Sequence, residues 1–420
     1  MNPFTAPTLA TMAHHFGTPL WVYDADTITR QIAALRQFDV VRFAQKANSN
    51  THILRHMRGL GVAVDAVSLG EIERALAAGY TPGLHQLNGT HHAEIVFTAD
   101  LLDRATLARV VELNIPVNCG SIDMLDQLGA VHPGHPVWLR INPGFGHGHS
   151  NKTNTGGEHS KHGIWHDDLT AALAKVRSNG LALQGLHMHI GSGVDYEHLQ
   201  AVCGAMIALA ETVKAQGMDL HAISAGGGLS VAYQAGEPGI DTAHYFSLWD
   251  AARQTVAGLL GHPVTLELEP GRYLVAESGV LVSEVRAVKT QGSKHFVMVD
   301  AGFSDLARPA MYGSYHGMEF IHADGTAADG PVQDTAVAGP LCESGDVFTQ
   351  GEGGVVLDRA LPAARVGDLL VLHDTGAYGA SMSSNYNTRP LVPEVLIENG
   401  QPRLIRRKQT VAELIGLEAV

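Results

Sequence analysis

Between residues 38 and 272, short apolar segments alternate with amphipathic segments whose apolar residues recur three and four positions apart. This alternation of strand-like and helix-like segments is typical of parallel sheets whose strands are connected by helices. Eight repeats predict a (β/α)8 barrel of the TIM type, with its chemistry on the loops that follow the strands. The expected strands are 40–46, 62–67, 94–98, 116–120, 137–141, 183–190, 220–225 and 264–269.

After residue 272 the pattern changes to strands joined by turns, with turn signals at Asp324-Gly325 and Asn399-Gly400. This predicts an all-β second domain, a sandwich or barrel-like sheet, and 420 residues exceed the usual size of one core. The strand-like segment 19–23 is expected to pair into that sheet. The predicted domains are 24–275 for the barrel and 1–23 plus 276–420 for the β-rich domain. Its expected strands are 280–289, 295–299, 335–339, 368–373 and 394–397.

Two segments fit no expected element. Residues 81–93 are predicted to be a loop rich in Gly, His and Asn, and residues 144–163 a mobile lid or surface loop. Ser68 and Glu71 have the spacing of a capping box at the start of the second barrel helix.

The charge and cysteine content narrow the class of protein. A formal net charge of −14 without a block of Lys or Arg argues against nucleic acid or an anionic membrane as partner. Three scattered cysteines do not make a disulfide framework, which fits a reducing compartment. The start of the chain lacks the pattern of a signal peptide, and no apolar run reaches membrane-spanning length. We therefore expect a cytoplasmic protein.

Lys46 ends the first expected strand, in the segment Phe43-Ala44-Gln45-Lys46-Ala47-Asn48. A lysine at the mouth of a barrel is expected to be partly desolvated, which favours a nucleophilic amine that can form a Schiff base with an aldehyde cofactor. Taken alone, a lysine at a strand end is more often a surface residue.

Three further motifs end the sixth, seventh and eighth expected strands: 187–193 (HMHIGSG), 226–228 (GGG) and 269–272 (EPGR). Separately they are compatible with packing histidines, a turn and a salt-bridged corner. Together with Lys46 they offer an amine, a backbone nest for phosphate, an aromatic ring and a carboxylate at one barrel mouth. This combination suits pyridoxal phosphate, whose pyridine nitrogen stays protonated beside a carboxylate.

The β-rich region contributes two more motifs. Residues 342–346 (CESGD) place the thiol of Cys342 beside the carboxylate of Glu343, and residues 374–378 (DTGAY) place Tyr378 on a Gly-containing turn. A free cysteine is often inert packing, but a polar turn also makes it a plausible proton donor.

These six motifs, in this order, resemble those of the fold-type III, alanine-racemase-like pyridoxal-phosphate-dependent decarboxylases, and among them the diaminopimelate decarboxylases. The resemblance runs from about Gly17 to the C-terminus. It implies pyridoxal phosphate as the cofactor, Lys46 as its covalent anchor and Cys342 as the proton donor. The further cofactor contacts that it implies are His189, Ser192, Gly227, Gly228, Glu269, Gly271, Arg272 and Tyr378.

The resemblance also implies meso-diaminopimelate as the substrate and a homodimer with shared active sites, in which Cys342 and Glu343 serve the partner subunit. The implied substrate contacts are Arg272, Arg308, Tyr312, Glu343 and Tyr378. Independently of the resemblance, the charges of these residues fit this substrate. Two arginines suit its distal carboxylate, and Glu343 suits its distal ammonium.

Three other interpretations stay open. One is a decarboxylase of another basic amino acid, ornithine- or arginine-like or carboxynorspermidine-like, and another is a non-catalytic regulatory homologue. A barrel enzyme that does not use pyridoxal phosphate is the third. The segment 84–94 departs from the family pattern. His147, His149, His159 and His162 match no zinc spacing, so no metal site is expected.

Overall fold

The computed structural model describes residues 3–87, 90–146, 156–189, 191 and 196–420. The chain divides into two compact units, which are treated separately below. The barrel unit consists of Arg30–Ser230 and Gly239–Tyr273, and the β unit of Met1–Thr29, Val231–Pro238 and Leu274–Val420. The expected domain limits, 24–275 and 1–23 plus 276–420, stay a prediction.

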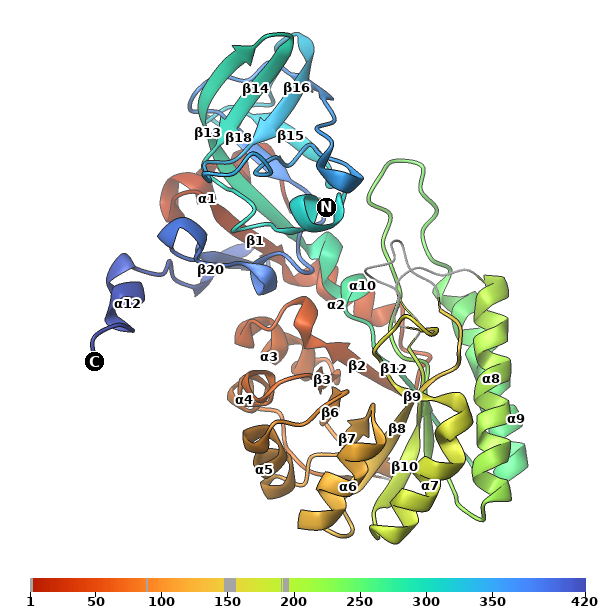
Figure 1. Cartoon of the computed structure of the whole chain (residues 1–420). Helices are drawn as coiled ribbons and strands as arrows, with labels where there is room; N and C mark the ends of the chain where they lie inside the picture. The colour runs from red at the N-terminus through yellow and green to blue at the C-terminus, as the bar shows by residue number, and fades with distance from the viewer. Residues whose placement is uncertain (1–2, 88–89, 147–155, 190, 192–195) are drawn as a thin grey trace. The chain divides into compact units, whose positions relative to one another are not determined.

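The barrel unit contains, within the described residues, a closed ring of eight parallel strands, and the predicted TIM-type barrel is confirmed (Figure 1). Pairing of β12 with β2 and of β10 with β8 closes the ring. The strands, in ring order, are β2 (Val40–Ala44), β3 (Ala63–Ala66), β6 (Ile95–Ala99), β7 (Val117–Cys119), β8 (Pro136–Asn142), β10 (Ala182–His187), β11 (Ala222–Ser224) and β12 (Thr265–Leu268).

Helices cover the outside of the barrel, so its strands are buried on both faces and read as nearly continuous apolar runs (Figure 1). Several helices begin at a side-chain cap, such as Asn50 before α3 and Asp241 before α9. Ser68 caps α4 as expected, but Glu71 accepts from the N–H of Val67 rather than that of Ser68, so the capping box is incomplete. The helices are α3 (Thr51–Gly59), α4 (Leu69–Ala77), α5 (Arg104–Glu112), α6 (Ile122–Val131), α7 (Leu169–Ser178), α8 (Tyr196–Ala215) and α9 (Thr242–Leu260).

The expectation that residues 81–93 form a loop without elements is wrong. The short strands β4 (His85–Leu87) and β5 (Thr90–His92) pair there as an antiparallel hairpin. Their polar, His-containing sequence hides the pairing, because backbone hydrogen bonds rather than an apolar alternation hold it. In the second segment, β9 (Ile164–Trp165) pairs with β8 and is followed by η2 (His166–Asp168), while residues 147–155 lie outside the described chain.

The β unit is built on a sheet with the order β17-β16-β14-β13-β1-β19-β20, and β18 joins β13 to β15 beside this path. The N-terminal strand β1 lies inside the sheet, antiparallel to β13 and parallel to β19. The strands are β1 (Leu20–Asp24), β13 (Gly279–Gln291), β14 (Lys294–Val299), β15 (Met318–Ile321), β16 (Val332–Ala338), β17 (Arg359–Pro362), β18 (Leu369–Leu372), β19 (Glu394–Glu398) and β20 (Gln401–Arg406).

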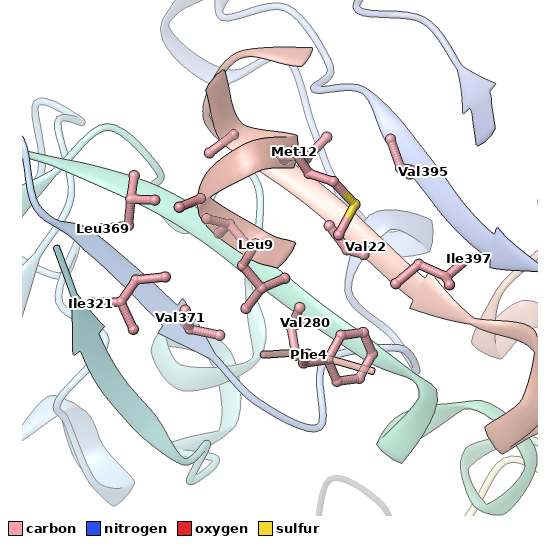
Figure 2. Packing of buried hydrophobic residues seen from close by; sticks show 14 residues of the cluster. Phe4, Leu9, Met12, Val22, Val280, Ile321, Leu369, Val371, Val395 and Ile397 are labelled. Atoms are coloured by element: carbon pink, nitrogen blue, oxygen red, sulfur yellow. The ribbon is translucent and has the colours of Figure 1, made fainter. Parts of the chain in front are cut away.

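Helix α1 (Ala6–Phe16) packs on one face of this sheet. Figure 2 shows Leu9 and Met12 of the helix against Val22, Val280 and other aliphatic side chains of the strands. Leu9 and Val22 have no exposed surface, so this contact forms the core of the unit.

The remaining short elements are the first helix after β1, the turns that carry several motifs and the C-terminal helix. They are α2 (Ala25–Ala33), η1 (Gln45–Ala47), α10 (Arg272–Val275), η3 (Ala276–Ser278), α11 (Arg308–Tyr312), η4 (Glu352–Gly354), η5 (Ala380–Met382), η6 (Tyr386–Thr388) and α12 (Val411–Gly416). Of the helices in the described ranges, none combines the length and apolar character needed to cross a membrane.

Candidate active site

The predicted site residues of the barrel unit follow the carboxyl ends of four strands. Lys46 comes two residues after β2, His189 two residues after β10, Gly227 three residues after β11, and Glu269 directly after β12. Because all barrel strands are parallel, these positions lie at the same end of the barrel, where TIM-type barrels carry their chemistry.

Glu269 is buried and bonded on both carboxylate oxygens. Its Oε2 lies 2.7 Å from Nε2 of His187, and its Oε1 accepts from the hydroxyl of Ser224 at 3.1 Å. Burial by itself would raise the pKa of Glu269, but the charge and hydrogen bond of His187 outweigh burial and lower that pKa. Glu269 is therefore held as a carboxylate inside the barrel.

His189 is held by the glycine-rich loop. The N–H of Gly227 donates to Nδ1 of His189 at 3.1 Å, so this ring nitrogen carries no proton. Burial, together with the positive charges of Lys46 and Arg140, lowers the pKa of His189 well below its usual range. The ring is thus a neutral imidazole fixed by the next loop of the barrel.

The glycines at 227 and 228 are required by close approach of the backbone. A Cβ atom on Gly227 would lie 2.5 Å from the carbonyl oxygen of Glu269, and one on Gly228 would lie 2.4 Å from that of Gly191. Gly228 also has a φ of +102°, a conformation that L side chains rarely adopt. The loops after β10, β11 and β12 therefore meet in a narrow nest of backbone.

Lys46 lies in η1, and its side chain is exposed in the single chain. The expectation that this lysine is partly desolvated is therefore wrong for the single chain. The cause is its position one residue into a short turn, beyond the strand that the barrel buries. Its charge nevertheless reaches the site, because it lowers the pKa of His189 and opposes the effect of burial on the pKa of Asp65.

Two other predicted residues of this unit follow Glu269 directly. Gly271 is buried, and Arg272 is half-buried at the start of α10. Ser192, expected to contact the phosphate, lies outside the described residues, as do His147 and His149. His162, in contrast, pairs with the carboxylate of Asp100 through its Nδ1.

Below the strand ends, the barrel interior holds a second set of charges. Arg42 of β2 forms a buried ion pair with Glu267 of β12 at 2.9 Å, and its Nη1 donates to the carbonyl of Ala93. Asp65 of β3 is also buried, and burial and the charge of Glu269 raise its pKa well above the usual range. These strand residues were not predicted.

In the β unit, Arg308 and Tyr312 occupy the two ends of α11, four residues apart and hence on one face. Arg308 is only 4% exposed, and Tyr312 is half-buried. The Nη1 atom of Arg308 lies 3.1 Å from the hydroxyl of Tyr233 and 3.1 Å from Nε2 of His316. Tyr378, with a φ of +56°, follows β18 and is half-buried.

Cys342 and Glu343 are exposed on a turn of the β unit. The N–H of Cys342 donates to the side-chain oxygen of Asn387 at 3.0 Å, and the hydroxyl of Tyr386 donates to Glu343. That hydrogen bond raises the pKa of Tyr386. The backbone of Cys342 and the carboxylate of Glu343 are therefore held from one side, and both residues are exposed.

Several residues that hold these groups were missed from the sequence. Ser224 and Glu267 had a usable signal, because each lies two residues before a motif residue on a strand, on the same face of the barrel. Tyr386 and Asn387 had none, since their contacts join segments far apart in the chain. His316 had none either, because its contact with Arg308 depends on how the turn between them folds.

Known proteins resemble this chain over nearly its whole length. Residues 25–276 match the family model described as pyridoxal-dependent decarboxylase, pyridoxal binding domain. The diaminopimelate decarboxylase of Escherichia coli K12 is 67% identical over 415 residues, covering 99% of this chain and 97% of that protein. The corresponding protein of Streptomyces coelicolor is 64% identical, covering 98% and 92%.

The chain belongs to the diaminopimelate decarboxylase family. A crystal structure of a diaminopimelate decarboxylase with 66% identity has a TM-score of 0.94, covering 100% of this chain and 97% of that one. The Helicobacter pylori diaminopimelate decarboxylase complexed with L-lysine is 30% identical, with a TM-score of 0.87 and coverage of 98% and 99%. The protein is thus a pyridoxal-phosphate-dependent carboxy-lyase.

The barrel residues suit this cofactor. The glycine nest provides close-packed backbone where a Cβ would not fit, as a phosphate cradle requires. Glu269 is a buried carboxylate with a lowered pKa, able to face a protonated pyridine nitrogen. Lys46 has its amine exposed at the same end of the barrel, where an aldehyde could reach it.

Proposed function

We propose that the protein removes one carboxylate of meso-2,6-diaminopimelate as CO2 and releases L-lysine, the last step of bacterial lysine biosynthesis. The observation that carries this proposal is the identity of 67% with a diaminopimelate decarboxylase over 99% of the chain. It is supported by the complex of the Helicobacter pylori relative with L-lysine, the product that this reaction would release.

In this proposal the barrel residues hold the cofactor. Lys46 anchors it through its amine, the ring of His189 stacks on it, and Glu269 faces its pyridine nitrogen. Ser192, Gly227, Gly228, Gly271 and Arg272, together with Tyr378 of the β unit, would contact its phosphate or the adjoining atoms. The bound cofactor supplies an electron-withdrawing ring that stabilises negative charge on the reacting carbon.

The protein's own contribution begins with proton placement. Glu269 stays ionised because His187 lowers its pKa, so a proton on the facing nitrogen is favoured. His189 stays neutral because Gly227 donates to its Nδ1, so it adds no positive charge above the ring. These two residues set the charge around the cofactor before any substrate binds.

Selectivity comes from the groups that meet the far end of the substrate. Arg272, Arg308, Tyr312 and Tyr378 bind the distal carboxylate, and Glu343 binds the distal ammonium. A buried guanidinium such as that of Arg308 strongly favours an anionic partner. Ornithine has no distal carboxylate, so it gains no binding energy from this guanidinium.

Cys342 is the proposed proton donor to the carbon that loses CO2, and it serves the active site of a partner subunit in a homodimer. The exposure of Cys342 and Glu343, which Asn387 and Tyr386 fix from one side, supports an arrangement in which a second copy covers them. The three free thiols also fit a cytoplasmic enzyme.

The reaction is tested by measuring CO2 and lysine formed from meso-diaminopimelate, its LL isomer, ornithine and arginine. We expect turnover of the meso compound and a loss of at least about a thousandfold in Lys46→Ala, with Lys289→Ala, an exposed lysine of β13, unchanged. Faster release from ornithine or arginine would instead indicate a decarboxylase of another basic amino acid. Absence of turnover with every compound would indicate a regulatory homologue.

The shared site is tested by mixing the inactive variants Lys46→Ala and Cys342→Ala under conditions of subunit exchange. Each mixed dimer then has one site with both residues intact, so activity should recover toward about a quarter of wild type under random pairing. If mixed dimers form and no activity returns, each chain completes its own site.

A further inference from the structure

The guanidinium of Arg308 is held by two side chains of the β unit. Both contacts use Nη1, which lies 3.1 Å from the hydroxyl of Tyr233 and 3.1 Å from Nε2 of His316. The Cζ atom of Arg308 also lies 5.0 Å from the centre of the Tyr233 ring, a cation–π distance. Two hydrogen bonds at one nitrogen and a stacked ring define the plane of the guanidinium.

The neighbours of His316 fix its tautomer. Its Nδ1 lies 2.9 Å from the carbonyl oxygen of His373, which can only accept, so Nδ1 carries the proton. A guanidinium can only donate, so Nε2 must present its lone pair to Arg308. His316 is completely buried, and the neutral ring therefore acts as a dedicated acceptor for this arginine.

The backbone of His316 is fixed as well. The N–H of His373 donates to the carbonyl of Gly317 at 2.9 Å, and Nη1 of Arg359 donates to the carbonyl of His316 at 2.7 Å. Arg359 in turn stacks on the ring of Tyr315, with Cζ 3.7 Å from its centre. The acceptor for Arg308 therefore has little freedom to relax, and it is tied to the residue that precedes the 374–378 motif.

We propose that His316, assisted by Tyr233, is a positioning residue for substrate selection: it holds Arg308 in the orientation that binds the distal carboxylate of the substrate. This inference rests on the proposed function, in which Arg308 contacts that carboxylate. An arginine that is already oriented loses less conformational freedom when it binds, which raises affinity for a ligand that it engages. A lysine or an unsupported arginine would not select the carboxylate as sharply.

The test uses two isosteric variants of the holoenzyme. His316→Asn keeps an N–H donor at the place of Nδ1 but removes the acceptor for Arg308, whereas His316→Gln keeps an acceptor at the place of Nε2. We expect His316→Asn to raise KM for meso-diaminopimelate about tenfold with a much smaller change in kcat. His316→Gln should raise KM much less, because it keeps the acceptor for Arg308. Tyr233→Phe should give a smaller rise of KM in the same direction.

Two competitive inhibitors separate positioning from general damage. L-lysine keeps the distal carboxylate after the other has been lost, whereas 1,5-diaminopentane has no carboxylate. The inhibition constant of L-lysine should rise about tenfold in His316→Asn, while that of the diamine changes less than about twofold. An equal rise for both inhibitors would overturn the proposal, because it would show loss of the pocket as a whole.

A double-variant cycle with Arg308→Lys gives the second criterion. If His316 acts through Arg308, adding His316→Asn to Arg308→Lys should raise KM less than about twofold further. The full tenfold effect in both backgrounds would overturn the inference. Unchanged KM in a folded His316→Asn would overturn it too, while leaving the proposed function intact. A wild-type enzyme that neither turns over meso-diaminopimelate nor binds L-lysine would instead refute the proposed function.

Discussion

In the barrel unit, the carboxylate of Glu269 is buried and bonded to His187 and Ser224. In the β unit, the carboxylate of Glu343 is exposed and accepts a hydrogen bond from Tyr386 at the edge of a turn. Both belong to the proposed active site. The barrel completes the environment of its carboxylate within one unit, whereas the β unit presents its carboxylate to the outside.

The difference separates two tasks. A group that must stay charged against a cofactor is fixed by burial and hydrogen bonds, and its pKa is set by neighbours in the same unit. In the proposed dimer, Cys342 and Glu343 must stay open to the partner, and Asn387 and Tyr386 hold them from one side only. Four predictions test this contrast, beginning with the largest expected effect.

The largest loss of stability is expected when a buried charge inside the barrel loses its partner. Arg42→Met leaves Glu267 buried without its ion partner, and we expect it to lower the free energy of unfolding by about 3–5 kcal/mol in urea denaturation. The matched control is Arg58→Met, which breaks the more exposed pair with Glu94 and should cost less than about 1 kcal/mol. Equal costs for the two variants would contradict the contrast between buried and exposed charge.

Two buried groups, one in each unit, should respond to pH in opposite directions. Burial lowers the pKa of His135 in the barrel to about 4, so its stabilising contribution is present near neutrality and lost as pH falls from about 6.5 to 4. Burial raises the pKa of Asp305 in the β unit to about 6, so its contribution is present below about pH 3.8 and lost as pH rises through 6. Each contribution is roughly 3 kcal/mol.

These contributions are measured as differences from wild type at several pH values. The stability difference of His135→Gln should change with acidification, and that of Asp305→Asn with alkalinisation. Amide hydrogen exchange of barrel and β-unit peptides assigns each effect to its unit. If the stability difference between wild type and either variant does not depend on pH, folding does not shift the pKa of the group that the variant replaces.

Glu269→Gln tests whether the buried carboxylate acts by its charge. The amide keeps the shape and one hydrogen bond but cannot balance a protonated nitrogen, so kcat should fall about 10- to 100-fold while the cofactor stays bound. Cofactor content is read from the absorbance of the purified enzyme. Full activity in this variant would assign the charge to another group.

The smallest effect is expected at the exposed carboxylate. Tyr386→Phe removes the hydrogen bond to Glu343 and should raise KM for meso-diaminopimelate several-fold, with little change in stability. Tyr23→Phe is the matched control, because its hydroxyl donates to Glu394 inside the sheet at 2.8 Å. That variant should lose about 1 kcal/mol of stability and keep its KM.

The sequence determined the barrel and the motif positions. Its short apolar runs and helical patterns predict all eight barrel strands, because burial on both faces leaves a strong apolar signal. The motifs fall where these parallel strands end. The hairpin of β4 and β5 and the strands β15, β17 and β20 escaped prediction, since edge and polar strands carry a weak pattern.

The partners of the site residues were decided by tertiary structure alone. His187 with Glu269, Gly227 with His189, and His316 with Arg308 each join segments that local sequence does not connect. Even residues as near as His316 and Arg308 meet because the intervening turn is clamped from elsewhere. Residue types and spacing identify the groups that carry chemistry, but charge state and orientation depend on what the folded chain places beside them.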